Sequence, residues 1–211
     1  MTDLSLFLPG FIAAYTILLV GASSPGPSVA MLIGIATSQG RVPALAATLG
    51  IAVGSTTINL LTMLGVGLLL SQAAWAISLL RLIGAAYLLY LACGAFRKAL
   101  NPPVLQPVTG KRRAAGKHFM AGYLLQITNP KAIAFWLAIA SVGATDGAGT
   151  GIVAIFIAGA FLISFICHGA WAMALSAHPV RLAYSAGRRW IELTLGAFFT
   201  FAAYKLATSE N

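Results

Sequence analysis

Long apolar stretches, separated by short polar connections, dominate the sequence. Six apolar segments fall at roughly residues 6–37, 42–70, 73–96, 118–143, 151–176 and 188–207. A bilayer core of about 30 Å requires about 20 apolar residues in a helix, and each segment reaches that length. The pattern therefore predicts an all-α membrane protein with six transmembrane helices.

The first and fourth apolar segments are each interrupted by a proline motif. The first contains Ser23-Ser24-Pro25-Gly26-Pro27, and the fourth contains Thr128-Asn129-Pro130-Lys131. Proline lacks the backbone donor and clashes with the preceding turn, so neither segment is expected to form one straight helix. Irregular backbone at membrane depth is tolerated only where protein buries it or where it lines a watery cavity. The alternative is a kink that serves packing alone.

The two interruptions occupy corresponding positions in two halves of one expected transmembrane transporter domain, residues 1–211. We expect a first repeat over residues 1–98, a cytoplasmic loop over 99–117 and a second repeat over 118–208. A unit of three spans enters the second half upside down, so the repeats would be inverted, as in many secondary transporters. The alternative is that the similarity between the halves arose by chance.

Charge and composition place this chain in a membrane and predict its orientation. Only 8% of residues are charged, against about 25% in soluble domains. The net charge of +9 does not indicate nucleic-acid binding, because the basic residues lie between apolar segments. Ten of them fall in connections on one side and only Lys205 on the other. Cytoplasmic loops carry the excess of Lys and Arg, so both termini are predicted to be periplasmic.

The two proline motifs supply the candidate substrate site. A half-helix that starts near Gly26 directs free N–H groups and a positive dipole end toward an anion. Asn129 followed by Pro130 is a favourable helix start, which puts Lys131 in the first turn. A mid-span lysine costs at least about 2.5 kcal/mol, so it indicates a cavity, a partner or a function, with snorkelling as the alternative.

We therefore expect the two breaks to meet near mid-membrane and to bind a zwitterion. The carboxylate is expected at the half-helix start and Lys131, and the ammonium at carbonyl oxygens freed by the prolines. Asn59 either joins this site or caps a neighbouring carbonyl. The predicted substrate-binding residues are Ser24, Pro25, Gly26, Pro27, Ser28, Asn59, Asn129, Pro130 and Lys131.

Few titratable groups are available for coupling to a proton gradient. His168 is the only imidazole deep in a predicted span, so it is the candidate proton-coupling residue, although it could equally cap a carbonyl. Glu192 falls near the inner end of the predicted sixth segment, four residues after Arg188, so we expect a local ion pair. No carboxylate is therefore expected at mid-span.

Three blocks in this order resemble the LysE/RhtB family of bacterial amino-acid exporters. They are Ser24-Pro25-Gly26-Pro27, Leu82-Ile83-Gly84-Ala85-Ala86-Tyr87-Leu88 and Thr128-Asn129-Pro130-Lys131-Ala132, and the resemblance covers essentially the whole chain. It implies proton-coupled secondary export of amino acids across the bacterial cytoplasmic (inner) membrane. A cationic substrate would leave its extra charge without a partner, so neutral substrates of the threonine, homoserine or leucine type are expected.

One stretch departs from the family pattern. Many relatives follow the Asn-Pro-Lys span with a Pro- and Phe-containing stretch, whereas this chain has Ser141-Val142-Gly143-Ala144-Thr145-Asp146. The difference puts the outer gate in doubt.

Other function classes receive less support from the residues. Export of another small solute or of a metal cation is one alternative, but the apolar segments hold no cluster of metal ligands. A membrane-embedded hydrolase using Ser24 and His168 is another, but no nucleophile motif is present. We expect a transporter rather than an enzyme, with no cofactor, no metal and no nucleic-acid partner. Small residues between Gly50 and Gly54 permit close helix contact within one chain or in a homodimer.

Overall fold

The computed structural model describes residues 4–72, 74–101 and 114–208. Within these residues the chain is helical and contains no strand, which confirms the all-α prediction. The elements are η1 (Leu4–Phe7), α1 (Leu8–Ser23), α2 (Pro27–Ser38), α3 (Arg41–Gln72), α4 (Ala74–Leu100), α5 (Ala115–Ile127), α6 (Pro130–Ala140), α7 (Thr150–Ala174) and α8 (His178–Thr208).

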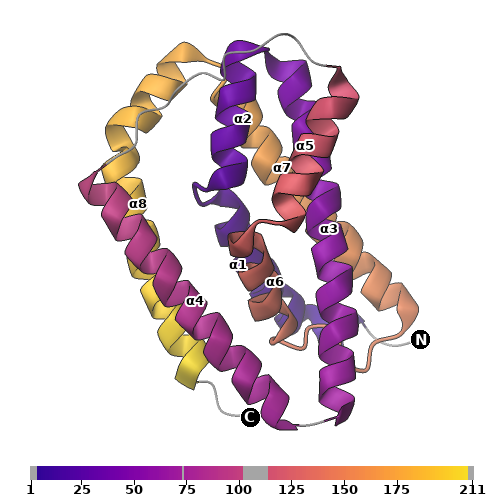
Figure 1. Cartoon of the computed structure of the whole chain (residues 1–211). Helices are drawn as coiled ribbons and strands as arrows, with labels where there is room; N and C mark the ends of the chain where they lie inside the picture. The colour runs from indigo at the N-terminus through magenta and orange to yellow at the C-terminus, as the bar shows by residue number, and fades with distance from the viewer. Residues whose placement is uncertain (1–3, 73, 102–113, 209–211) are drawn as a thin grey trace.

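Both predicted interruptions are present. The first apolar segment divides into α1 and α2, and the fourth divides into α5 and α6. In Figure 1 the pair α1 and α2 rises, α3 descends and α4 rises, whereas α5 and α6 descend, α7 rises and α8 descends. Each element of the second half therefore runs opposite to its counterpart in the first half.

Three stretches of helix in the described part of the chain are long and apolar enough to cross a membrane, namely Leu4–Ser23, Arg41–Gly65 and Thr150–Ala174. Two shorter apolar helices, Pro27–Ser38 and Pro130–Ala140, are the second halves of the interrupted segments. Length and composition thus support membrane insertion, while the arrangement of six spans in two repeats stays a prediction.

Glycines bring α3 and α5 into close contact. A Cβ atom at Gly50 would overlap the carbonyl oxygen of Phe119, and one at Gly122 would overlap that of Ala47. A Cβ atom at Gly54 would lie 3.0 Å from the backbone oxygen of Tyr123. Small residues allow helix backbones to approach in this way. The Gly50 to Gly54 stripe is therefore used within one chain, and a homodimer stays a prediction.

Helices α4 and α8 lie side by side along one flank of the bundle (Figure 1). A Cβ atom at Gly196 would lie 2.6 Å from the ring of Phe96, so the glycine accommodates that ring. Phe199 of α8 contacts Phe135 of α6, with ring centroids 5.7 Å apart. This aromatic contact is one link between the pair and the helices that carry the two breaks.

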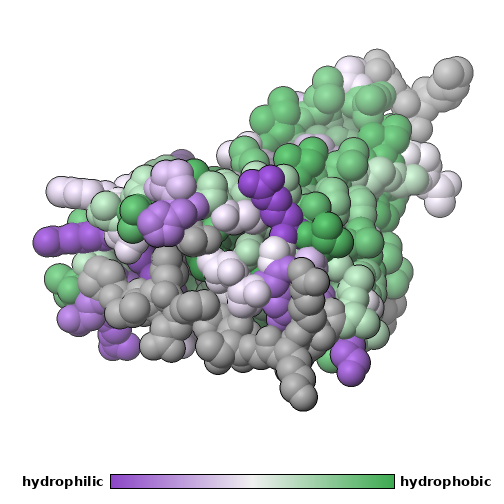
Figure 2. Space-filling model, turned by 90° about the horizontal axis from the view of Figure 1, so that it is seen from above, coloured by the Kyte–Doolittle hydropathy of each residue, from purple (hydrophilic) through white to green (hydrophobic). Residues whose placement is uncertain are grey.

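Hydrophilic residues gather at one end of the molecule. Figure 2 views the end at which α3 begins and α4 finishes, and it shows purple hydrophilic residues over the left and centre of this face and green hydrophobic residues on its right. The exposed basic residues near that end are Arg41, Arg97, Lys98, Lys117 and Arg189. Most of the predicted cytoplasmic loop, residues 102–113, lies outside the described residues.

The position of Glu192 differs from the prediction. Helix α8 begins at His178 instead of near residue 188, so Glu192 lies in the middle of a 31-residue helix. Its side chain is 1% exposed, and its Oε1 atom has no hydrogen-bond partner. The basic side chains that act on it electrostatically are Lys98 of α4, Arg188 of its own helix and Lys131 of α6. The prediction that Glu192 lies near the start of the last helix was therefore wrong, whereas the absence of a carboxylate at mid-span stays a prediction.

Candidate functional site

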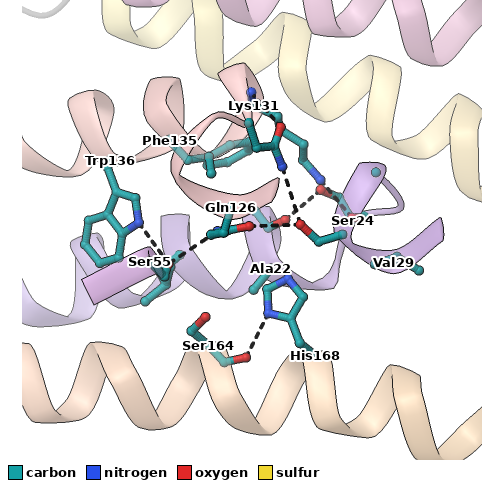
Figure 3. Close-up of a pocket in the computed structure, with 16 residues that line it drawn as sticks. Ala22, Ser24, Val29, Ser55, Gln126, Lys131, Phe135, Trp136, Ser164 and His168 are labelled. Atoms are coloured by element: carbon teal, nitrogen blue, oxygen red, sulfur yellow. Dashed lines mark hydrogen bonds between the residues drawn. The ribbon is translucent and has the colours of Figure 1, made fainter. Parts of the chain in front are cut away.

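The two breaks meet through a direct hydrogen bond. The Lys131 side chain, at the start of α6, donates from Nζ to the backbone oxygen of Ser24 in the first break, at 2.8 Å (Figure 3). Gly26 lies beside the same side chain, because a Cβ atom there would be 3.1 Å from Lys131 Nζ. A residue more than one hundred positions away thus completes the first break.

The carbonyl oxygens freed by the prolines have partners within the protein. Pro25 leaves the Gly21 oxygen without its helical donor, and the Ser24 hydroxyl donates to that oxygen at 2.9 Å. Pro27 likewise leaves the Ser23 oxygen without its helical donor, and this oxygen accepts from Trp171 Nε1 at 3.2 Å. A carbonyl oxygen has a second lone pair, so these groups keep capacity for a further donor.

The N-terminus of α2 lacks a side-chain cap. Gly26 occupies the cap position in an extended conformation, and Pro27 is the first helical residue. The early N–H groups of a helix have no partner within the helix, and they attract negative charge. The N–H groups of Ser28 and Val29 are in this first turn, and both residues line the cavity at the break.

A network of polar side chains joins four helices around the breaks. Ser28 Oγ of α2 donates to Gln126 Oε1 of α5 at 2.9 Å. Trp136 Nε1 of α6 donates to Ser55 Oγ of α3 at 3.0 Å, and Gln126 Nε2 lies 3.5 Å from the same hydroxyl (Figure 3). Asn129 Nδ2 lies 3.4 Å from Ser28 Oγ. These contacts hold α2, α3, α5 and α6 at one point.

The breaks enclose a cavity of about 30 Å³. A cavity needs about 10–15 Å³ to hold one water molecule, so this one has room for only a few waters in this conformation. An amino acid cannot enter without a widening of the cavity. The lining residues include one cationic side chain and no carboxylate: Leu18, Gly21, Ala22, Ser24, Gly26, Ser28, Val29, Ser55, Gln126, Asn129, Lys131, Ala132, Phe135, Trp136, Ser164 and His168.

His168 lines this cavity from α7 and is 5% exposed. Its Nδ1 atom lies 2.8 Å from the backbone oxygen of Ser164 (Figure 3). A carbonyl only accepts, so this contact requires the proton on Nδ1 and leaves Nε2 of a neutral ring as an acceptor. The Ser164 hydroxyl in the same wall is buried without a partner.

The structure brings together most of the predicted site residues. Ser24, Gly26, Ser28, Asn129, Lys131 and His168 all line the cavity. The prolines Pro25, Pro27 and Pro130 shape the two breaks without lining it. In the part of the chain that the structure describes, no group of three or more His, Cys, Asp or Glu side chains could hold a metal ion.

Asn59 is the exception, because it lines a separate cavity of about 370 Å³. The residue is 1% exposed, and neither Nδ2 nor Oδ1 has a hydrogen-bond partner. A buried polar group without a partner costs about 1–3 kcal/mol, which makes this amide a notable feature of α3.

Among the residues of the central cavity that carry a polar side-chain group, sequence reasoning missed four: Ser55, Gln126, Trp136 and Ser164. A helical period would have indicated Ser55, because the buried polar residues Thr48, Ser55 and Asn59 of α3 are spaced by seven and four positions. Ser164 and His168 are likewise four apart on α7, and both are buried.

Comparisons with known proteins agree on one family. A family model described as LysE type translocator matches residues 19–210. The "Threonine efflux protein" of Escherichia coli (strain K12) is 29% identical over 199 residues, which cover 90% of this chain and 93% of that protein. The protein of the same name from Salmonella typhi is 28% identical over 187 residues, covering 86% of this chain and 89% of the relative.

One relative carries a name that states a different function. The "Chemotactic transduction protein ChpE" of Pseudomonas aeruginosa is 33% identical over 127 residues, which cover 59% of this chain and 61% of that protein. No solved structure is a significant match to this chain.

Proposed function

The chain belongs to the LysE type translocator family, and from this premise we propose that it is a secondary-active exporter of neutral amino acids. The membrane would be the bacterial cytoplasmic membrane. Two similar proteins carry the name threonine efflux protein, which supports small neutral amino acids as substrates.

The observation that carries this proposal is the 2.8 Å contact between Lys131 Nζ and the Ser24 oxygen. In the resting protein the lysine ammonium binds an acceptor of the kind that a substrate ammonium needs. When a zwitterion enters, its carboxylate attracts Lys131 and the uncapped N–H groups of α2. Its ammonium then takes the Ser24 oxygen that the lysine has left. Both substrate charges are compensated in this way, as an apolar surrounding requires.

The preference for neutral side chains follows from the lining of the central cavity. None of the residues that line it is acidic. The extra cation of lysine or arginine would therefore remain uncompensated at membrane depth, which costs several kcal/mol or more. Export of a cationic amino acid as the best substrate would contradict this part of the proposal.

Transport by the purified protein in liposomes tests the function directly. Vesicles loaded with unlabelled threonine, homoserine or leucine should accumulate the labelled amino acid by counterflow, and protein-free vesicles should not. A growth-inhibition panel of amino acids and dipeptides, in cells with and without the protein, then identifies the chemical class. If no amino acid gave counterflow or relief of growth inhibition, another small solute would become the better hypothesis.

The hydrolase alternative receives no support from the site. The Ser24 hydroxyl donates to the Gly21 oxygen at 2.9 Å, and His168 contacts Ser164 instead. A nucleophilic serine needs a base within hydrogen-bond reach.

For topology, we propose six spans in two inverted repeats, with the basic end of the bundle in the cytoplasm. The gathering of basic residues at one end and the opposite directions of the two halves support this arrangement. A single cysteine introduced at residue 109 should resist an impermeant thiol reagent in intact cells and react after permeabilisation. Labelling in intact cells would place that loop outside and reverse the orientation.

For proton coupling, we propose His168 as the first candidate and Glu192 as the second. His168 lines the substrate cavity, and Glu192 is a buried carboxylate within electrostatic reach of Lys131. We expect export driven by a pH gradient to fall in His168→Gln, while counterflow, which needs no net proton movement, persists. Glu192→Gln tested in the same way separates the candidates. If both variants kept gradient-driven export unchanged, proton transfer would not pass through either residue.

A further inference from the structure

A second cavity, larger than the central one, lies toward the opposite end of the bundle from the basic residues. It measures about 370 Å³ and is bounded by α3, the end of α6, the connection at residues 143–147 and α7. The central cavity holds about 30 Å³. Of these two cavities, the second is large enough, in this conformation, to hold a molecule of the size of an amino acid.

Asn59 brings to the wall of this cavity a polar side chain that nothing in the protein satisfies, and both of its polar atoms are covered in this conformation. The residue lines the cavity from α3, is 1% exposed, and has no partner for Nδ2 or Oδ1. An asparagine side chain offers two donors and one acceptor oxygen. Buried amides in folded proteins are almost always paired, so an unpaired one needs a partner of the kind that a ligand or a water molecule supplies.

The remaining lining is mostly apolar, with a carboxylate at Asp146. A turn holds this residue, because the Asp146 N–H donates to the Gly143 oxygen at 3.1 Å. Gly143 and Gly147 both adopt positive φ, 66° and 71°, which an L-residue rarely does. Binding sites for small molecules combine such an apolar lining with a few placed polar groups. An amide and a carboxylate complement the carboxylate and ammonium of a zwitterion.

The two cavities follow one another along the same pair of helices. Ser55 lines the central cavity, and Asn59, one turn later on α3, lines the outer one. On α6, Trp136 lines the central cavity and Ile139 the outer one. Trp136 is 2% exposed and is held by its hydrogen bond to Ser55. The indole therefore belongs to the layer between the cavities.

We propose that the cavity at Asn59 and Asp146 is a second, outer binding subsite, which receives the amino acid after it passes Trp136. The inference rests on the proposed function and extends it from one site to two. The Asn59 amide binds the substrate carboxylate, and the Asp146 carboxylate binds its ammonium.

Asn59→Leu tests the subsite through two readouts that move in different directions. Leucine removes both unpaired polar groups, so the melting temperature should stay the same or rise. Counterflow of labelled threonine should nevertheless fall, by about tenfold or more, because hydrogen bonds to a charged ligand are lost. Thr56→Val is the matched control: its hydroxyl bonds only within α3, to the Ala52 oxygen at 3.1 Å, and its counterflow should equal that of the wild type.

Asp146→Asn provides a test that does not depend on the folding of the Asn59 variant, because Asp146 is exposed. We expect the half-saturating threonine concentration on the side of residues 143–147 to rise by about threefold to tenfold, through loss of one charge contact. If the wild type transports while both variants match it, the subsite is refuted and the proposed function stands. If the wild type transports no amino acid, both proposals fail.

Discussion

The two interrupted segments differ in how the N–H groups at the start of their second helices are satisfied. At the second break, Asn129 caps α6 with its own side chain, accepting from the Lys131 N–H at 3.1 Å. At the first break, Gly26 leaves the start of α2 without a side-chain cap. The second break is thus satisfied locally and contributes a cation, whereas the first contributes uncapped backbone groups and binds that cation.

The difference shows how one site can be assembled from two unlike halves. A capped helix start is a stable platform, and its first-turn lysine can reach across to another element. An uncapped start is poorer in local stability but free to bind an anion. We infer that the first break binds substrate and that the second positions the charge that helps it.

Lys131→Gln should have the largest effect on transport, because it removes the cation that the second break supplies. Losing a charge-assisted hydrogen bond should lower the rate of amino-acid counterflow by about 10–100-fold. Lys205→Gln, in the last turn of α8, is the matched control and should transport like the wild type. A Lys131→Gln protein that transported at the wild-type rate would remove this lysine from the site.

Gly26→Ala should have an intermediate effect on the first break. Its φ of −164° suits any residue, so folding is not at issue, but the new methyl would lie 3.1 Å from Lys131 Nζ. We expect the half-saturating substrate concentration to rise by about threefold to tenfold, or about 1 kcal/mol. Gly94→Ala, which has open space around it, is the control. Equal effects of both alanines would argue against crowding of the lysine.

Asn129→Ala should have the smallest effect, and it should act on stability. Losing the cap of α6 costs about 1 kcal/mol, which lowers the melting temperature by about 2–4 °C for a protein of this size. Asn129→Ser keeps a capping oxygen and should restore most of the loss. If serine melted no higher than alanine, the hydrogen bond to the Lys131 N–H would not be what stabilises the break.

Local rules were sufficient to predict where the chain breaks. Pro25 and Pro27 cannot continue α1, and the Asn129-Pro130 pair is a favourable start for α6, so both interruptions follow from a few neighbouring residues. The resemblance to the exporter family was confirmed by the family model over residues 19–210. The groups that meet at the breaks were harder to predict, because the partner of Lys131 is a backbone oxygen in the other break, 107 positions away in the sequence.

Two side chains illustrate what the sequence could not provide. Asn59 and Ser55 share a face of α3, but one helical turn separates them into different cavities, and that depends on where Trp136 packs. Glu192 was placed at a helix end because the first ten residues of α8 are polar enough to hide its start at His178. Apolar windows locate the most hydrophobic part of a helix, whereas its ends depend on packing and on local capping.

The central cavity of about 30 Å³ also influences the amino-acid concentration at which the protein would begin to work. Because an amino acid does not fit this narrow cavity, a substrate would bind only to the fraction of molecules in which the cavity has widened. With about 1% of molecules open, the apparent dissociation constant is about 100-fold weaker than that of the open form. The exporter proposed above would then stay idle while cytoplasmic amino acids are scarce and would discharge them only in surplus, so a narrow resting cavity would spare the cell's own nutrients.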